Sequence, residues 1–326
     1  MSIYAACDLG GTNIKAGLVD IKKGKVLISD IIPANAHQGS DAVLKRMGEF
    51  TRELIEKSGI AKKDIRGLGV SAPGMLDLEK GVSLFMTNLP GKWRKVPICE
   101  VLGGYLELPV SILNDVRAIT LGEYTFGAGR GVDSMACLAI GTGIGGGLVI
   151  DGKLVLGISG MAGEIGHQTI DVHGERCGCG NYGCLETYAS GPAIASMAER
   201  AVRQGMTTSI GKLVDYDLNK ITPKIVAQAA NEGDEIAKEI WERAGSALGT
   251  GIANVLTIVG PRRVVLCGGV ANAGDLLLDP IRRTIDKRVF LMPKEEVEIV
   301  LGELGKEAGI LGMAQWAALQ DTGKQE

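Results

Sequence analysis

A nine-residue motif that occurs twice constrains the fold of this chain more than any other feature. Residues 11–19 read GTNIKAGLV and residues 141–149 read GTGIGGGLV, with six identical positions at a constant offset of 130. An apolar segment typical of a strand precedes each copy. Each copy predicts a strand, a glycine turn and a second strand, and the recurrence predicts two similarly built domains.

The rest of the chain alternates between strand and helix patterns, which predicts an α/β protein. Strands are expected at residues 3–7, 16–19, 65–70, 110–113, 135–140, 148–150, 264–267 and 297–301. Helical spacing of apolar residues predicts helices at 41–58, about 118–124, 224–254 and 308–319. We expect a smaller domain of residues 1–118 with 305–326, and a larger domain of residues 119–304.

Composition excludes several classes of protein. The 326 residues are 45% hydrophobic, which is enough for a large core, and the net charge of −3 comes without a basic run. Nucleic acid is therefore a poor candidate for a partner. The N-terminus does not resemble a signal peptide, and no apolar run reaches the roughly 18 residues of a membrane helix. We expect a soluble, cytoplasmic protein, in which clustered cysteines indicate metal or redox chemistry more than disulfides.

The two glycine turns are candidates for phosphate binding. Neither is a Walker A loop or a GxGxxG turn, because a second strand follows each, but their backbone amides could face a phosphate. Asp8 precedes the first turn and could hold water on Mg²⁺, whereas Leu138 takes the equivalent place in the second. The alternative is two tight hairpins that need glycine. Two matched turns, together with a strand that runs into the glycine pair Gly268–Gly269, favour a nucleotide site. The predicted nucleotide-binding residues are Asp8, Gly10, Gly11, Thr12, Asn13, Lys15, Gly141, Thr142, Gly143, Gly145, Gly268 and Gly269.

Three cysteines crowd into residues 177–186, CGCGNYGCLE, with the spacing C-x-C-x₄-C. Thiols separated by glycine turns suit a structural zinc ion, which needs four ligands. His167 and His173 are the candidates for the fourth ligand, and Asp, Glu or Cys137 would be poorer ones. A disulfide, a redox role or unliganded core cysteines are the alternatives, although a C-x-x-C redox pair is absent.

The arrangement resembles the superfamily of sugar kinases, actin and heat-shock chaperone ATPases, through DLGGTN at 8–13, AIGTGIG at 139–145 and VLCGGV at 265–270. A closer similarity is to the ROK family of repressors, open reading frames and kinases. AGEIGH at 162–167, followed by CGCGNYGCLE, matches the signature of that family. Its C-x-C-G-x-x-G-C-x-E core is matched at every fixed position, and Glu175 stands where the family often has glycine.

The ROK resemblance implies two RNase H-like domains of the actin and hexokinase type, with a nucleotide and sugar cleft between them. It implies that zinc is bound by His167, Cys177, Cys179 and Cys184, and that Asp115 is the catalytic base. The implied sugar contacts are Asn114, Asp115, Glu164, His167, Glu186, Gly74 and Asn88. Without the resemblance, Asn114–Asp115 would be interpreted as a turn or a helix cap. Arg117 departs from the small or amide residue expected there, and we interpret it as a surface or hinge contact.

The activity implied is ATP-dependent phosphorylation of a hexose primary hydroxyl, with glucose to glucose 6-phosphate as the first choice. Kinases of N-acetylmannosamine, N-acetylglucosamine, fructose and allose share the same motifs, and a homo-oligomer (dimer or tetramer) is typical of the family. One alternative is a sugar-responsive regulator, although the family's repressors carry a helix-turn-helix before the first phosphate motif, which here begins at residue 8. Another alternative is a chaperone-like ATPase or a filament protein. The zinc loop and the EIGH motif argue against it.

Overall fold

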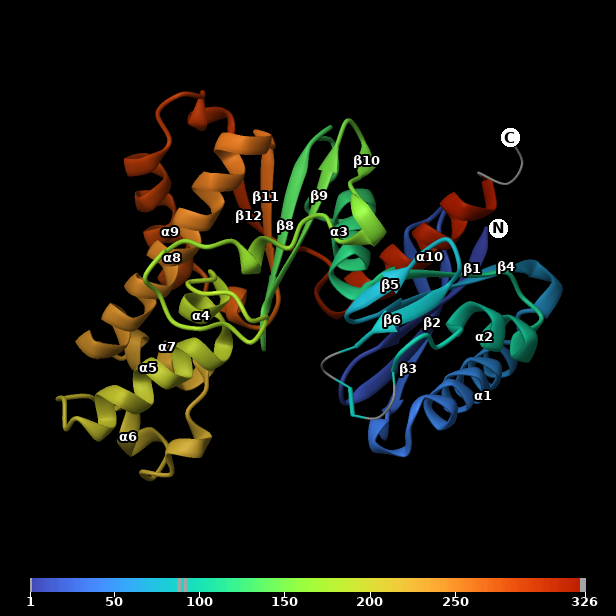
Figure 1. Ribbon diagram of the computed structural model, residues 1–326, viewed down its shortest axis with the longest axis horizontal. Coiled ribbons are helices and arrows are strands. Elements are labelled where there is room, and N and C mark those ends of the chain that lie inside the picture. Colours follow the sequence, from blue (N-terminus) through green and yellow to red (C-terminus); the bar gives the residue numbers. More distant parts are fainter. Residues whose placement is uncertain (1, 87–88, 91–92, 323–326) are drawn as a thin grey trace. The chain divides into compact units, whose positions relative to one another are not determined.

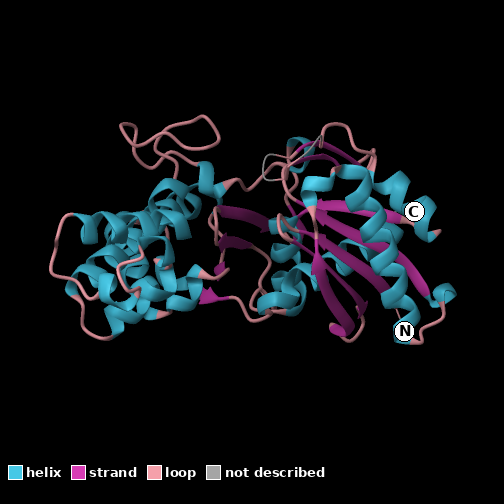
Figure 2. Ribbon diagram, turned by 90° about the horizontal axis from the view of Figure 1, so that it is seen from below, coloured by secondary structure: helices cyan, strands magenta, loops and turns pink. Residues whose placement is uncertain are grey.

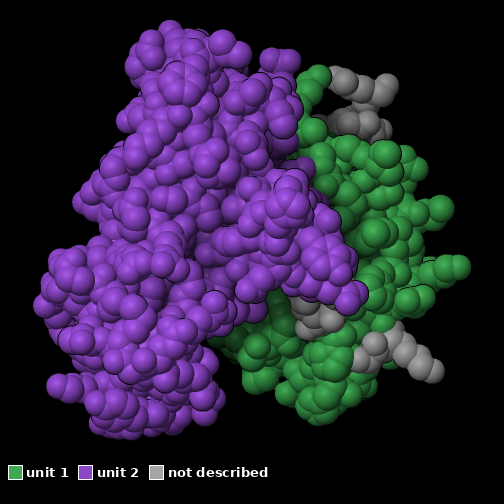
Figure 3. Space-filling view, turned by 60° about the vertical axis from the view of Figure 1, so that its left-hand side comes forward, with its two compact units in different colours: residues 1–131, 153–162, 303–326 green, residues 132–152, 163–302 purple. Residues whose placement is uncertain are grey.

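The computed structural model of the chain describes residues 2–86, 89–90 and 93–322. The chain divides into two compact units (Figure 3). Unit 1 consists of Met1–Gly131, Lys153–Ala162 and Glu303–Glu326, and unit 2 consists of Val132–Gly152 and Gly163–Gly302. Asn88, one of the predicted sugar contacts, lies outside the described residues.

The sheet of unit 1 has five strands in the order β3-β2-β1-β4-β7. Strands β1, β2 and β3 form an antiparallel meander, whereas β4 and β7 run parallel to β1. Because β1, β4 and β7 are parallel neighbours, their carboxyl ends meet at one edge of the sheet. The strands are β1 (Ile3–Leu9), β2 (Asn13–Asp20), β3 (Lys25–Pro33), β4 (Ile65–Ala72) and β7 (Val110–Asn114).

Helices cover both faces of this sheet (Figure 1). Alternate side chains of β1 point to opposite faces, as the pleat requires. Ile3 and Ala5 pack in a cluster with α1 (Ser40–Ser58) and α2 (Ile98–Leu106). Tyr4 and Ala6 pack in another with α3 (Asp115–Phe126) and α10 (Ala308–Thr322). Unit 1 also has the hairpin β5 (Met75–Asp77) and β6 (Val82–Phe85), and the 3₁₀ turns η1 (Ala36–Gln38), η2 (Lys62–Asp64), η3 (Ile158–Gly160) and η8 (Gly305–Glu307).

The second sheet repeats the topology of the first, because its order is β10-β9-β8-β11-β12. Strands β8 and β9 form an antiparallel hairpin, and β11 and β12 run parallel to β8. Each copy of the repeated motif therefore lies in the same place, in the hairpin that precedes the parallel strands. The strands are β8 (Met135–Ile140), β9 (Ile144–Ile150), β10 (Lys153–Leu154), β11 (Arg263–Cys267) and β12 (Glu298–Leu301).

Unit 2 is rich in helix, as Figure 2 shows in cyan. Its core joins β8 and β11 to the long helix α8 (Glu235–Val259), which packs along α9 (Asp275–Arg288). The other helices are α4 (Glu186–Ala189), α5 (Gly191–Arg203), α6 (Ile210–Leu213) and α7 (Pro223–Asn231), with 3₁₀ turns η4 (Ile165–His167), η5 (Leu218–Lys220), η6 (Val270–Ala273) and η7 (Lys294–Glu296). None of the helices in the described part of the chain combines the length and apolar character that a bilayer span requires.

Two helix predictions need correction. The single helix predicted at 224–254 is wrong, because α7 ends before Gly233, whose φ of +98° breaks the helix. The carboxylate of Asp234 then caps α8 by accepting from the backbone N–H of Ala237 at 2.9 Å. The helix predicted from residue 118 instead begins at Asp115, because the side chain of Asn114 caps it.

The predicted domain boundary at 118/119 falls inside α3. The whole of α3 stays in unit 1, because it packs along α10, and unit 1 therefore runs to Gly131. Its far end is fixed by the fully buried carboxylate of Glu123, which accepts from the backbone N–H groups of Ala128, Glu303 and Leu304 at 3.0 to 3.1 Å. These bonds tie the end of α3 to the segment that returns to unit 1.

Candidate active site

The carboxyl ends of β1, β4 and β7 bring polar side chains together in unit 1. Asp8 and Ser71 are register partners on the parallel strands β1 and β4, and Ser71 donates to Asp8 Oδ1 at 2.5 Å. Asn114 ends β7 beside Ala72. Ligands of α/β proteins commonly bind at such an edge. Sequence analysis missed Ser71, which could have been found only by pairing the SAPG segment with β1.

The environment of the two acids at this edge disfavours charge. Burial raises the pKa of Asp8, although the Ser71 hydrogen bond and the charge of Lys15 oppose this. Burial raises the pKa of Asp115 as well, and so does the charge of Asp8, against the N–H of Val116 and the charge of Arg117. A carboxylate is the kind of hard oxygen donor that Mg²⁺ prefers, so Asp8 fits a role in holding a magnesium ion. A carboxylate of raised pKa also suits a general base.

Asn114 and Asp115 form the start of α3. Asn114 Oδ1 accepts from the backbone N–H groups of Val116 at 3.1 Å and Arg117 at 3.4 Å. The helix-cap interpretation is therefore what the structure shows, and it gives both side chains a fixed place at the strand end. Of the two interpretations of Arg117, a surface contact or a hinge contact, the surface alternative is wrong, because this residue is only 1% exposed.

The first glycine turn joins β1 to β2 and exposes its polar groups. Gly10 N donates to Asn13 O at 2.9 Å, which closes the turn, and Gly11, Thr12 and Asn13 are exposed. Lys15 Nζ donates to the carbonyl of Lys306 at 2.5 Å. Burial lowers the pKa of Lys15, while the nearby charges of Glu307 and Asp8 act in the opposite direction. The turn thus places amides, a hydroxyl and an ammonium group near Asp8.

The second glycine turn, residues 141–143, and the glycine pair Gly268–Gly269 lie at one edge of the second sheet. Gly141 N donates to Gly143 O at 2.8 Å, so this turn is closed over one residue fewer than the first. Thr142 is exposed in the turn, and Gly145 pairs with Ala139 across the hairpin. Gly268, with a φ of +90°, directly follows the parallel strand β11, and a Cβ there would lie 2.3 Å from Ile140 O. Glycine is therefore required at 268 for the two strand ends to approach, and Gly269 follows directly.

Glu186 contacts this second turn. Its Oε2 accepts from Ile144 N at 2.9 Å, and a Cβ on Gly143 would lie 2.3 Å from the same oxygen. Gly166 of the EIGH segment packs on the carbonyl of the same Ile144. Three predicted features of unit 2, namely Glu186, EIGH and the glycine turn, therefore converge on the backbone of one residue.

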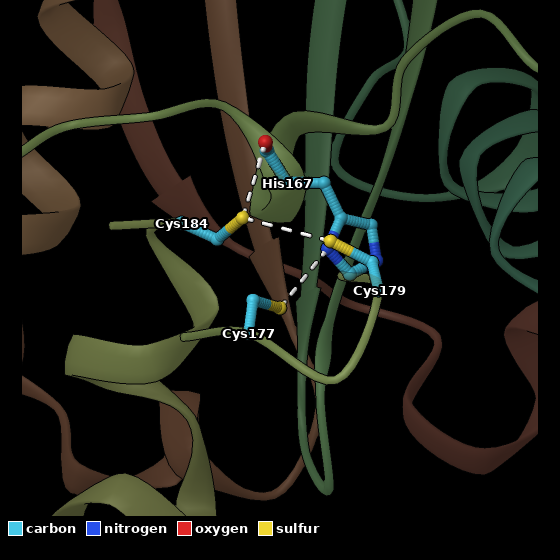
Figure 4. A group of neighbouring side chains, drawn as sticks. All are labelled: His167, Cys177, Cys179 and Cys184. Carbon is cyan, nitrogen blue, oxygen red and sulfur yellow. Dashed lines mark hydrogen bonds between the residues drawn. The ribbon is translucent and has the colours of Figure 1, made fainter. Parts of the chain in front are cut away.

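The four predicted zinc ligands gather in unit 2 (Figure 4). Their ligand atoms, from His167, Cys177, Cys179 and Cys184, all lie within 4.8 Å of one another. Cys179 Sγ lies 3.8 Å from Cys184 Sγ, and Cys177 Sγ lies 3.7 Å from His167 Nδ1. A tetrahedral zinc ion with bonds of about 2.3 Å to sulfur separates its sulfur ligands by about 3.8 Å. The donor set therefore fits zinc.

The three thiols of the cluster differ in their pKa shifts. Burial and the neighbouring thiols raise the pKa of Cys184 to about 12, and burial raises that of Cys177. The pKa of Cys179 is lowered instead, chiefly because its sulfur accepts from the backbone N–H of Asn181. Zinc binds cysteine as the thiolate, so an ion at this site would displace the protons of Cys177 and Cys184. Of the other candidates for a fourth ligand, His173 is exposed outside this group, and Cys137 lies 3.8 Å from Cys267 in the second sheet.

Nδ1 is the His167 nitrogen that lies 3.7 Å from Cys177 Sγ, and Nε2 is on the other side of the ring. Glu164 directly precedes η4, which carries His167, and Glu186 lies next to the cluster, with Oε1 3.9 Å from Cys177 Sγ. Gly74 has a separate structural reason to be glycine: its φ is +83°, and a Cβ there would lie 2.4 Å from Phe85 O.

Comparison with known proteins gives a consistent result. The model of the ROK family matches residues 4–320. A glucokinase of Halalkalibacterium halodurans is 33% identical over 99% of this chain and 97% of its own length. A xylose repressor of Caldicellulosiruptor bescii is 31% identical over 89% of this chain and 71% of its own length. A ROK glucokinase of Streptomyces griseus, solved in complex with glucose and AMPPNP, superposes with a TM-score of 0.83 at 31% identity, covering 98% of this chain and all of its own. These matches confirm the two-domain sugar kinase fold, and the chain belongs to the ROK family.

Proposed function

We propose that this chain is an ATP-dependent sugar kinase that phosphorylates the primary hydroxyl of a hexose, with glucose as the first candidate. The observation that carries the proposal is the pair Asp8 and Asp115 at the carboxyl edge of the first sheet, where one acid can hold a metal and the other can accept a proton. The proteins most similar to this chain include glucokinases, and the S. griseus relative was solved with glucose and an ATP analogue.

In the proposed reaction Asp115 accepts the proton of the sugar hydroxyl. The hydroxyl oxygen attacks the γ-phosphorus, the new O–P bond forms, and the bond to the β-phosphate oxygen breaks to release ADP. Mg²⁺, when bound near Asp8, would neutralise charge on the β- and γ-phosphates. Amides of the glycine turns at 10–13, 141–143 and 268–269 are the proposed phosphate contacts, with Lys15 as a cation. Most of the rate enhancement would come from positioning and charge stabilisation.

The sugar ligands proposed for unit 2 are Glu164, His167 and Glu186, and Asn114 is the ligand proposed for unit 1. The carboxylates accept from sugar hydroxyls, and His167 Nε2 faces a hydroxyl while Nδ1 faces the zinc site. Zinc has a structural role here, since the thiols and His167 supply four ligands and leave no open position. For Gly74 the close backbone packing is a sufficient explanation without sugar binding.

The test is an ADP-release assay with a panel of hexoses: glucose, mannose, fructose, N-acetylglucosamine, N-acetylmannosamine and allose. We expect turnover that depends on ATP, Mg²⁺ and one preferred hexose, with glucose giving the highest kcat/KM. If a different hexose is preferred, the substrate assignment is wrong and the kinase assignment stands. If ATP is consumed at the same low rate with and without every sugar, the kinase proposal fails.

A sugar-responsive regulator is the second candidate, because a xylose repressor is 31% identical to this chain. The regulator hypothesis predicts that a sugar binds, as measured by calorimetry, without any phosphate transfer to it. Asp8 and Asp115 argue for the kinase, since a protein that only binds sugar has no use for a metal ligand and a proton acceptor at one strand edge.

A further inference from the structure

Arg117 is a buried charged residue that the proposed reaction leaves without a role. Its Nε and Nη2 donate to the carbonyl oxygen of Ala162 at 3.1 and 2.8 Å, and its Nη1 donates to Asn114 Oδ1 at 3.0 Å. All three residues belong to unit 1. Burial of a guanidinium group costs free energy unless hydrogen bonds within the protein replace those to water. The three hydrogen bonds of Arg117 therefore stabilise its buried position.

The bond to Asn114 fixes the orientation of its amide. Asn114 Oδ1 accepts from three donors: Val116 N, Arg117 N and Arg117 Nη1. An amide oxygen has two lone pairs, so these donors saturate it. The NH₂ group is then the end of the side chain that serves a ligand, and Asn114 acts toward that ligand as a donor. A hydroxyl that accepts from Asn114 can still donate its own proton to Asp115.

The bonds to Ala162 anchor an irregular segment of the chain. Residues 156–162 contain Gly157, Ser159 and Gly160 with φ values of +61°, +53° and +71°, so no regular ladder holds them. Ala162 N donates to Leu156 O at 3.0 Å, and Arg117 holds the carbonyl of the same Ala162. Both peptide groups of Ala162 are therefore fixed, two residues before Glu164.

We propose that Arg117 is a positioning residue of the sugar site, which orients the Asn114 amide as a donor and anchors the chain at Ala162. The kinetic part of this inference rests on the proposed kinase function, whereas the anchoring part does not. The guanidinium charge has a separate effect, because it lowers the pKa of Asp115 against burial and the charge of Asp8, which raise it. Substitutions of Arg117 can therefore separate the effect of its hydrogen bonds from the effect of its charge on Asp115.

The experiment compares Arg117→Met, which removes both donors and charge, with Arg117→Lys, which keeps the charge but lacks the planar fork of donors that reaches Asn114 and Ala162 together. We expect both variants to raise the sugar KM about tenfold, since hydrogen bonds to charged groups are lost, and to change the ATP KM less than about twofold. The acidic limb of the profile of kcat/KM against pH moves to higher pH in Arg117→Met and stays in place in Arg117→Lys. Arg52→Met is the control, because Arg52 also donates to a backbone carbonyl of unit 1, that of Tyr105, and should leave the kinetics unchanged.

Hydrogen exchange measured by mass spectrometry tests the anchor without reference to activity. Peptides covering residues 155–163 should exchange faster in both Arg117 variants than in wild type and Arg52→Met. A sugar KM within twofold of wild type in Arg117→Met, or in Arg117→Lys if the first variant does not fold, overturns the orienting role. Unchanged exchange at 155–163 overturns the anchoring role. If the wild type transfers phosphate to no hexose, the proposed function fails, and the exchange data alone decide on Arg117.

Discussion

Asp115 illustrates at the residue scale how a functional group costs stability. Burial and the charge of Asp8 raise its pKa, so the folded protein holds a proton on Asp115 at a pH where the unfolded chain has lost it. The free energy of unfolding therefore falls as the pH rises from the ordinary aspartate pKa of about 4 through the raised value. Above that value the carboxylate is charged, ready to accept a proton, and destabilising.

Asp115→Asn should have opposite effects on activity and stability. We expect kcat to fall by about 10³-fold or more, because the proton acceptor is lost. We also expect the unfolding midpoint at pH 7, without ligands, to rise, because a buried charge is removed at constant size. Steady-state kinetics and thermal unfolding at pH 4 and pH 7 check both, and the stabilisation should be smaller at pH 4. A variant that retains a tenth of the wild-type turnover would show that Asp115 is not the base.

Arg117 shows what a residue-by-residue reading of the sequence cannot supply. Asp8, Asn114 and Asp115 stand next to strand ends, and this position alone indicates a functional edge. The partner of Arg117, the backbone carbonyl of Ala162, is 45 residues away along the chain, and the methyl side chain of alanine does not signal a polar contact. The interpretation of Arg117 as a surface or hinge contact rests on its departure from the residue expected at that position, and only the fold shows it buried.

At the scale of elements, the strands were predictable where they are buried. Strands β1, β8 and β11 read as short apolar runs because both of their faces are covered. Strand β3 (Lys25–Pro33) was missed because it is an edge strand, largely exposed, whose sequence is mixed. Helix α9 was also missed; it contains Pro280, a residue that argues against a helix interior, yet it packs along α8. The formation of β3 and α9 therefore depends on tertiary packing rather than on the local sequence pattern.

The second glycine turn provides a prediction at this scale. Gly143→Ala should displace Glu186 from Ile144 N, because the added Cβ would lie 2.3 Å from Glu186 Oε2. The carboxylate end can move, so we expect the protein to fold with a loss of about 1 kcal/mol for one hydrogen bond. The sugar KM should rise several-fold, since Glu186 is a proposed sugar ligand.

Gly141→Ala is the matched control in the same turn, because a Cβ there meets nothing within 4 Å. It should keep the wild-type unfolding midpoint and sugar KM, and any effect should appear in the KM for ATP. If Gly143→Ala and the wild type have equal sugar KM values, the proposal that Glu186 is a sugar ligand is wrong.

At the scale of the whole molecule, the two sheets share one topology, but the two units carry different chemistry. The orders β3-β2-β1-β4-β7 and β10-β9-β8-β11-β12 are equivalent, as the repeated motif predicted. Unit 1 holds the two acids and Arg117, whereas unit 2 holds the cysteine cluster beside its glycine turn. The sequence repeat could predict the shared topology of the two sheets, because glycine turns and apolar strands are recognised from short stretches of sequence. The division at Gly131, the return of Lys153–Ala162 to unit 1 and the hydrogen bonds of Glu123 depend on long-range packing, which no local pattern encodes.

The cysteine cluster gives a prediction that concerns unit 2 as a whole. A metal held by His167 and the three thiols links the EIGH segment to the residue pair Cys184–Leu185 that leads into Glu186. Cys179 is the exposed ligand, so Cys179→Ser removes a thiolate without opening a cavity in the core. We expect zinc, measured by mass spectrometry of the purified protein, to fall well below one ion per chain. The unfolding midpoint should fall, because a structural zinc site contributes directly to folding free energy.

The same variant should raise the sugar KM more than the ATP KM, because His167 and Glu186 lose their common support. Cys99→Ser, which alters a half-buried thiol of unit 1, is the control and should keep both zinc and sugar affinity. Chelation of the wild type should reproduce the effect of Cys179→Ser, and added zinc should reverse it only in the wild type. One zinc ion per chain in Cys179→Ser, together with a normal sugar KM, would show that the cluster does not set the position of the sugar ligands.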